Sequence, residues 1–352
     1  MTTSPLARAA RRTSYGLAAL LLLAAIAHTV LWWQGTRLLE QEAARWIAAR
    51  EAEGMAVRHG PPVRGGWPFA ARLSLPDAAA SGVLQVERQG SVPVSFRTPA
   101  IVLEVALGAP RTLVIEVASP FRIAAPGFDA TGEARLLRIQ APLAQQGRQA
   151  PDLIAQGLVI ATAGDRLAAE DLTLVAVRDP AARGDQPALS LLLTATGVDL
   201  PASSQPALGA RVARAVLDIH LVGMPPGRGS AQAQALAWRD AGGFVQIPRL
   251  LLDWGPLSLD ADATLALDQA AQPSGEGRAR MAGLPATLDR LMQAGLIDRQ
   301  AAQAGRTIVA FMQRTPAGGG PPVVELPLAL RNRVLSAGRL TLLQLPPIAW
   351  PP

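Results

Sequence analysis

The sequence predicts a mainly β protein of the α+β class. We expect an N-terminal transmembrane helix and stalk, then a large curved antiparallel β-sheet or sandwich with a C-terminal helix pair packed on it. Three observations predict this: an apolar stretch near the N-terminus, many short β-type segments separated by Gly and Pro, and two helical segments near the C-terminus. With 49% hydrophobic and 17% charged residues in 352, the chain has enough apolar residues to fold.

The first element is a predicted membrane-spanning helix over residues 15–33. This stretch, YGLAALLLLAAIAHTVLWW, has no formal charge except a possible one on His28. As a helix it would be about 28 Å long, against a hydrocarbon core of about 30 Å. A cleaved signal peptide ending at Ala27 is the alternative, because Ala25-Ile26-Ala27 has the spacing of a cleavage site.

The charges around this segment predict its orientation. Arg11 and Arg12 lie on its N-terminal side, and Trp32 and Trp33 close it at the other end. Basic residues stay on the cytoplasmic side and tryptophans favour the interface, so we expect all four residues at the membrane surfaces. Residues 1–14 are then a cytoplasmic basic tail, and the body lies outside the cytoplasm.

The membrane helix is expected to continue as a stalk over residues 34–54. This segment is rich in Ala, Leu, Glu and Arg and contains no Pro, and Gly54 is a plausible stop.

Residues 55–352 are expected to form the β-rich body. Segments with period-two alternation or β-branched residues recur at short intervals, which indicates antiparallel pairing because parallel pairs need long crossovers. Pro201 and Pro206 interrupt the pattern and leave open two lobes, residues 55–200 and 212–352. The expected strands are 71–75, 82–87, 100–105, 112–117, 136–139, 158–161, 172–177, 189–194, 215–221, 233–238, 323–330 and 340–345.

Residues 286–313 interrupt the strands with a predicted helix pair. Leu288, Leu291 and Met292 share a helical face, Gly295 breaks the run, and Asp298 is a suitable N-cap for the second helix. We expect this pair to cover one end or one face of the sheet.

Two stretches carry a resemblance to a known family. They are Val57–Phe69, and Gly242–Asp268 followed by the two helices, Glu325–Leu335 and Leu345–Ile348. Their order resembles a membrane-anchored envelope family of Gram-negative, mainly alphaproteobacterial, proteins known as domain of unknown function two-one-two-five. The resemblance implies an inner-membrane anchor with the body in the periplasm.

The strand pattern is also similar to that of AsmA-like envelope proteins, some of which are implicated in lipid traffic. Tight turns of such repeats favour Asn-Gly, whereas this chain has Asn332-Arg333 and Asp262-Ala263, which questions the turn geometry there.

Composition restricts the chemistry. Because the chain has no Cys and only three His, thiolate nucleophiles and Cys-ligated metals are excluded and a His-rich metal site is disfavoured. All 33 basic residues are Arg, scattered among apolar residues, and aromatic residues amount to 4%, which argues against a nucleic-acid partner. We therefore predict no enzyme activity, no metal and no cofactor.

Candidate ligand contacts are few. Trp67 and Phe69 either present a binding loop or pack under the first strand to seal the sheet end, and Trp254 is a third candidate. Leu191-Leu192-Leu193 and Leu250-Leu251-Leu252 place apolar side chains on both phases of a strand. Such strands belong to a closed core or to a lipid groove.

Three functions follow as hypotheses. The first is a non-enzymatic envelope protein that handles lipid or another apolar ligand in a curved β groove. The second is a structural or interaction subunit of an inner-membrane complex, in which the anchor packs on a membrane protein partner. The third, a carboxylate-dependent hydrolase using acids such as Glu170-Asp171, Asp260 and Asp262, lacks a visible activated nucleophile.

Overall fold

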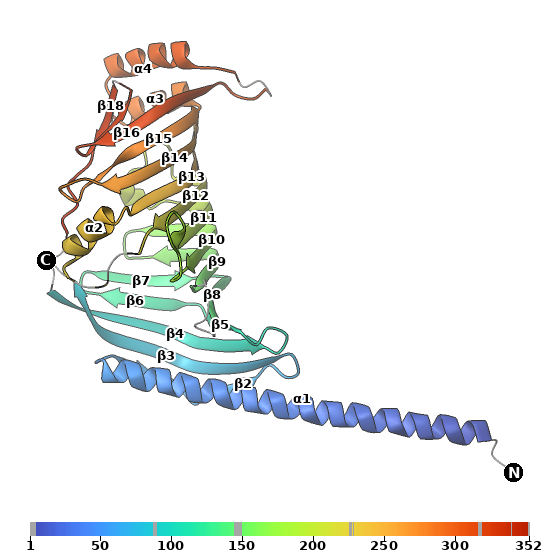
Figure 1. Cartoon of the computed structure of the whole chain (residues 1–352). Coiled ribbons are helices and arrows are strands. Elements are labelled where there is room, and N and C mark those ends of the chain that lie inside the picture. Colours follow the sequence, from blue (N-terminus) through green and yellow to red (C-terminus); the bar gives the residue numbers. More distant parts are fainter. Residues whose placement is uncertain are drawn as a thin grey trace.

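A computed structural model gives the architecture (Figure 1). It describes residues 5–86, 90–143, 150–224, 227, 229–315, 319–338 and 340–350, and for 5–19, 84–86, 90 and 340 it describes the backbone alone. The described part forms one antiparallel sheet of 18 strands, with a long N-terminal helix and a C-terminal helix pair. The predicted mainly β fold is confirmed, and the sheet is a single layer instead of a sandwich.

The N-terminal helix α1 runs without interruption over Pro5–Ala52, and Gly54 with φ 88° follows it. Its side chains up to residue 19 lie outside the described ones, so Arg11, Arg12 and the start of the predicted span are not placed. Within the described residues, no helix combines the length and the apolar character needed to cross a bilayer.

The strands pair with their neighbours in chain order over most of the sheet. From β9 the pairing runs β9–β10–β11–β12–β13–β14–β15–β16–β17–β18, and at the other end β1 and β2 both pair with β3. Figure 1 shows the strands stacked above α1 towards β18. The strands are β1 Ala56–Arg58, β2 Val63–Gly65, β3 Ala70–Val86, β4 Gly90–Ala106, β5 Thr112–Val117, β6 Phe121–Ala125, β7 Phe128–Glu133, β8 Leu136–Pro142, β9 Asp152–Ala161, β10 Arg166–Arg178, β11 Pro187–Asp199, β12 Arg211–Val222, β13 Phe244–Trp254, β14 Leu257–Leu267, β15 Pro273–Ala282, β16 Val323–Arg331, β17 Val334–Ala337 and β18 Leu340–Gln344.

Between β4 and β9 the sheet divides into two columns of short strands. β5 and β8 connect one half of β4 to one half of β9, and β6 and β7 connect the other halves. In the second column the Phe121 ring packs on Gly132, where a Cβ atom would come within 2.1 Å of it. β6 and β7 were not among the predicted strands.

A line of irregular residues, which we call the crease, crosses β3 to β12. Asp77, Gly157 and Gly197 have positive φ values of 49°, 58° and 56°. By register Asp77 lies opposite Pro99, and Glu170 lies opposite both Gly157 and Gly197. The breaks between the two columns of short strands continue the line.

The apolar positions change phase at the crease. In β3, Ala71, Leu73 and Leu75 are buried on odd positions, whereas Ala78 is buried on an even one. A residue with positive φ reverses the side from which the following side chains emerge, so both sets fall on the same face of the sheet. The same phase change appears in the sequences of β4, β9, β10, β11 and β12.

The sheet is open on both faces over most of its length. The accessible surface is 22413 Å², against about 13,500 Å² expected for a compact monomer of 36.7 kDa. Among the described residues, extensive helix contacts reach only a few strands: α1 contacts β1 and β3, and the other helices contact β14 and β16. In that part of the chain no helix makes extensive contacts with β5 to β12.

Three further α-helices and a 3₁₀ turn complete the fold. The C-terminal pair is α3 (Leu284–Gln293) and α4 (Arg299–Met312), and Asp298 caps α4 by accepting from the Ala301 N–H, as predicted. The 3₁₀ turn η1 covers Ala202–Ser204. The strand predicted at 233–238 is wrong, because α2 occupies Ala231–Asp240 with Ser230 as its N-cap.

The structure shows the geometry at the two turn positions that the sequence singled out. Asn332 and Arg333 both have positive φ, 50° and 66°, so the tight turn between β16 and β17 keeps the geometry that Asn-Gly would give. Asp262 and Ala263 are not a turn but lie inside β14. Between the proposed lobes, β11 pairs with β12, so the sheet continues across residues 200–212.

Candidate functional site

An uninterrupted row of apolar side chains crosses the sheet on one face. Each member is the direct cross-strand partner of the next, from β3 to β16. Directly opposite residues point to the same face of a sheet. The row consists of Leu73, Leu103, Ile115, Ile139, Leu153, Leu174, Leu193, Leu217, Leu250, Ala261, Ala279 and Leu326.

A second row runs beside the first, two residues away along each strand from β8 to β16. We call the two rows together the apolar strip. The members of this second row are Leu137, Ala155, Leu172, Ala195, Ala215, Leu252, Leu259, Met281 and Val324.

The apolar strip is long and mostly uncovered. Neighbouring strands lie about 4.8 Å apart, so the first row extends over roughly 50 Å. Its start is covered by α1, where Gly35 lies against Ala71 and Leu73 is fully buried. The leucines further along are half-buried and retain accessible surface, whereas Ala155, Ala279 and Val324 are buried.

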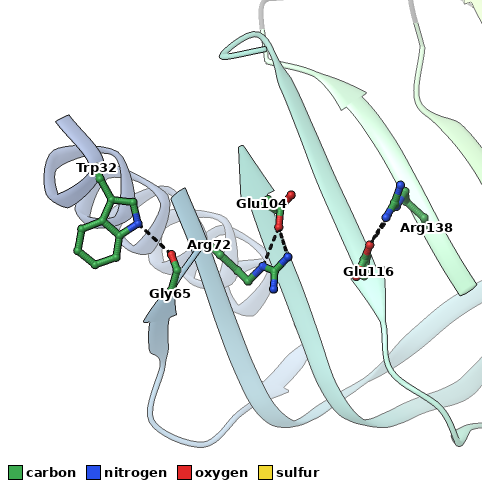
Figure 2. A network of polar contacts seen from close by, with 6 residues as sticks. All are labelled: Trp32, Gly65, Arg72, Glu104, Glu116 and Arg138. Carbon is green, nitrogen blue, oxygen red and sulfur yellow. Dashed lines mark hydrogen bonds and ion pairs between the residues drawn. The ribbon is translucent and has the colours of Figure 1, made fainter. Parts of the chain in front are cut away.

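The opposite face carries paired charges. Arg72 bonds Glu104 across β3 and β4, and Arg138 bonds Glu116 across β5 and β8 (Figure 2). The pattern continues with Arg214 and Asp253 and with Arg280 and Glu325 on later strands. Exposed pairs of this kind contribute only about 0–1 kcal/mol each, so their main effect is to keep this face in water.

Two exposed clusters of ion-paired side chains on this face contain groups with shifted pKa values. The hydrogen bond from Arg122 lowers the pKa of Asp129 on the paired strands β6 and β7. The pKa of Arg211 is raised, first by its hydrogen bond to Asp199 and then by that to Glu170. Both clusters are therefore held charged, as ion pairs in solvent.

The aromatic candidates predicted from the sequence do not form one site, because Trp254 lies on β13 and outside the loop that carries Trp67 and Phe69. Trp67 and Phe69 lie in the loop between β2 and β3 and are 57% and 81% exposed, so they do not pack under the first strand. Trp254 is half-buried on β13, where its indole N–H donates to the Gly209 carbonyl at 2.7 Å.

The Trp residues at the end of the predicted span have different surroundings. Trp32 donates its indole N–H to the Gly65 carbonyl at 3.0 Å. Trp33 is 45% exposed, and the Arg37 guanidinium lies 5.2 Å from its ring centroid.

The acidic residues considered for a hydrolase belong to the charged face and its ion pairs. Glu170 accepts from Arg211, and the Thr196 hydroxyl lies 3.4 Å from Asp171. Asp260 and Asp262 line a hollow of about 410 Å³ together with Arg278, Arg280 and Glu325. Across the described residues, no three His, Asp or Glu side chains converge as metal ligands.

The sequence reasoning did not identify the apolar strip. It noted Leu191-Leu192-Leu193 as apolar on both phases, but the structure separates them: Leu191 and Leu193 lie on the strip side and Leu192 on the charged face. The signal that could have found the strip is the alternation of apolar positions in each strand, with one phase change in β3, β4 and β9 to β12.

These features define a class: an open, single-layer β protein with one apolar and one charged face, carried on a long N-terminal helix. A family model described as an uncharacterized protein conserved in bacteria, DUF2125, matches residues 32–346. The chain belongs to this family. No curated protein and no solved structure matches the chain.

Proposed function

We propose that this protein is a membrane-anchored envelope protein that holds lipid acyl chains along the apolar strip. The observation that carries the proposal is the first row, in which every cross-strand step from Leu73 to Leu326 joins two apolar residues. A strip that is apolar, about 50 Å long and partly exposed beyond the segment that α1 covers has an unfavourable contact with water, which an apolar ligand relieves. No nucleophile or cofactor is required for this role.

The proposed anchor supports the same function. On α1, Leu20 to Leu23 are each more than 60% exposed, and Ile26 and Leu31 are 53% and 60% exposed. A helix surface of this kind is compatible with lipid as its surroundings. By the positive-inside rule the body then lies in the periplasm, next to the inner membrane.

The direct test is site-specific photocrosslinking in the full chain, expressed in a Gram-negative host. Benzoyl-phenylalanine replaces Leu193 in the first row, or its neighbour Leu192 on the charged face. We expect lipid adducts, identified by mass spectrometry of the purified chain, from position 193 and not from position 192. Equal adduct yields at the two positions, or none at either, would reject the lipid function.

A second proposal is an interaction subunit of a membrane complex. The observation that favours it is the exposed apolar surface of the C-terminal pair: Phe311 is 87% exposed, Leu296 65% and Ile308 45%. Crosslinking from Phe311 tests it. A single stoichiometric protein adduct at Phe311, together with no lipid adduct at Leu193, would favour this function over the first.

A further inference from the structure

Two side-chain hydrogen bonds from α1 hold the loop between β2 and β3, one at Pro68 within the loop and one at Gly65, the last residue of β2. His28 donates from Nε2 to the Pro68 carbonyl. Trp32 donates from Nε1 to the Gly65 carbonyl at 3.0 Å (Figure 2). The loop therefore has a fixed position beside residues 28–32 of the helix.

The two large side chains of this loop remain in solvent. Phe69 is 81% exposed and Trp67 is 57% exposed. From Gly65 to Ala71 the sequence, GGWPFAA, contains no charged residue. An uncharged loop with two exposed aromatic side chains is a typical membrane or partner contact.

The level of the loop along α1 indicates which contact it makes. The helix beside the loop is apolar, with Leu31 60% exposed, and its charges begin at Arg37, whose guanidinium lies over the Trp33 ring. Since a helix rises about 1.5 Å per residue, His28 lies roughly 7.5 Å before Trp33 along the helix axis. This distance matches the depth of about 5–10 Å to which interfacial apolar groups enter a bilayer.

We propose that the loop of residues 66–69 inserts Trp67 and Phe69 into the periplasmic leaflet beside the anchor. The occupant is the phospholipid bilayer, because His28 and Trp32 hold the uncharged loop beside the apolar part of α1. This inference rests on the membrane anchor of the proposed function. With α1 as the only membrane contact, the sheet would be free to rotate about the helix axis. Contact through both α1 and the loop holds β3, where the apolar strip begins, against the lipid.

The absence of Cys allows a depth measurement with single labels. Three variants of the full chain, Phe69→Cys, Phe311→Cys and Leu22→Cys, carry an environment-sensitive fluorophore. They are reconstituted in phosphatidylethanolamine–phosphatidylglycerol vesicles with or without spin-labelled lipid as quencher. Phe311, 87% exposed on α4, is the matched control, because it is the same residue type at the opposite end of the sheet (Figure 1).

The expected result is strong quenching and a blue-shifted emission at positions 69 and 22, with neither at position 311. Quenching at 22 with position 69 behaving like 311 would overturn the loop insertion and leave the anchor in place. No quenching at 22 would overturn the anchor and the loop insertion together. Lipid binding on the apolar strip is tested independently by the crosslinking at Leu193. A failure of the proposed function can therefore be distinguished from a failure of the loop insertion.

Discussion

Replacing Leu193 by Gln tests the assignment of the two sheet faces. Leu193 lies on β11 in the first row of the apolar strip, between its partners Leu174 and Leu217. Its neighbour Leu192 lies on the charged face, 39% exposed and opposite Asp218. Leu192→Gln is therefore a control that makes the same chemical change one residue away.

The expected loss of lipid affinity follows from the burial of Leu193. Full burial of a Leu side chain contributes about 1.5–3 kcal/mol, and because Leu193 is half-buried already, a lipid covers only part of it, worth about 1 kcal/mol. Covering an unpaired Gln amide costs about 1 kcal/mol more. The total of about 2 kcal/mol corresponds to roughly 30-fold weaker binding. At Leu192 we expect no measurable change.

The assay uses the full chain in nanodiscs that contain a phospholipid with a photoactivatable acyl chain. After irradiation and digestion, labelling of peptides from β10 to β12 is quantified for both variants, and circular dichroism checks that each is folded. Equal labelling of two folded variants would refute the assignment of the strip as a lipid surface. Loss of labelling in Leu192→Gln alone would show that the faces are reversed.

Four further predictions concern the fold. Gly197→Ala should lower the free energy of unfolding by about 1–2 kcal/mol in a denaturant titration, because φ at this crease position is 56°; an unchanged stability would contradict the crease. Arg333→Gly should raise it by about 0.5–1 kcal/mol by relieving a φ of 66° in the β16–β17 turn, seen as a higher Tm. Gly132→Ala should cost about 1–3 kcal/mol, since the new methyl would meet the Phe121 ring, and Phe121→Leu in the same chain should restore part of it. An NMR titration should give Asp129 a pKa below its ordinary value of 3.8, because Arg122 donates a hydrogen bond to its carboxylate. The pKa of Asp129 is thus lower in the folded state than in the unfolded state. The ion pair therefore stabilises the fold fully above the unfolded-state pKa, and this stabilisation is lost as the pH falls through the folded-state pKa.

The elements that the sequence predicted well have strong local signals. The α3–α4 pair follows from apolar residues at helical spacing, Gly295 as a break and Asp298 as a cap, all of which the structure contains. Parts of the long strands follow from alternation, although the predicted segments 71–75 and 82–87 form one strand, β3, and β14 and β15 were not among the predicted strands. These signals depend on a few neighbouring residues, and so they can be read along the chain.

The errors arose where local patterns were short or ambiguous. Residues 233–238 alternate like a strand, but Ser230 accepts a hydrogen bond from the Ala233 N–H and begins a helix. The C-terminal end of α2 is held by Trp238, whose ring packs on Gly243. Strands β6 and β7 have five and six residues, are separated by Pro126-Gly127, and gave too weak a pattern.

The candidate site could not be predicted from single segments. Each strand contributes one or two residues to the apolar strip, so the strip exists only after the register of all pairs is known. The attachment of the Gly66–Phe69 loop to α1 is equally non-local, because His28 and Pro68 are 40 residues apart. Neither feature has a sequence motif of its own.

Because the sheet is open, its length can change through the number of its strands alone. Since every further hairpin would add two strands, the strip would lengthen by about 10 Å per hairpin without any change to α1 at one end or to α3 and α4 at the other. In a closed barrel or sandwich the same insertion would have to alter the whole cross-section. The number of hairpins therefore sets the length of the sheet, measured from α1 to its far end.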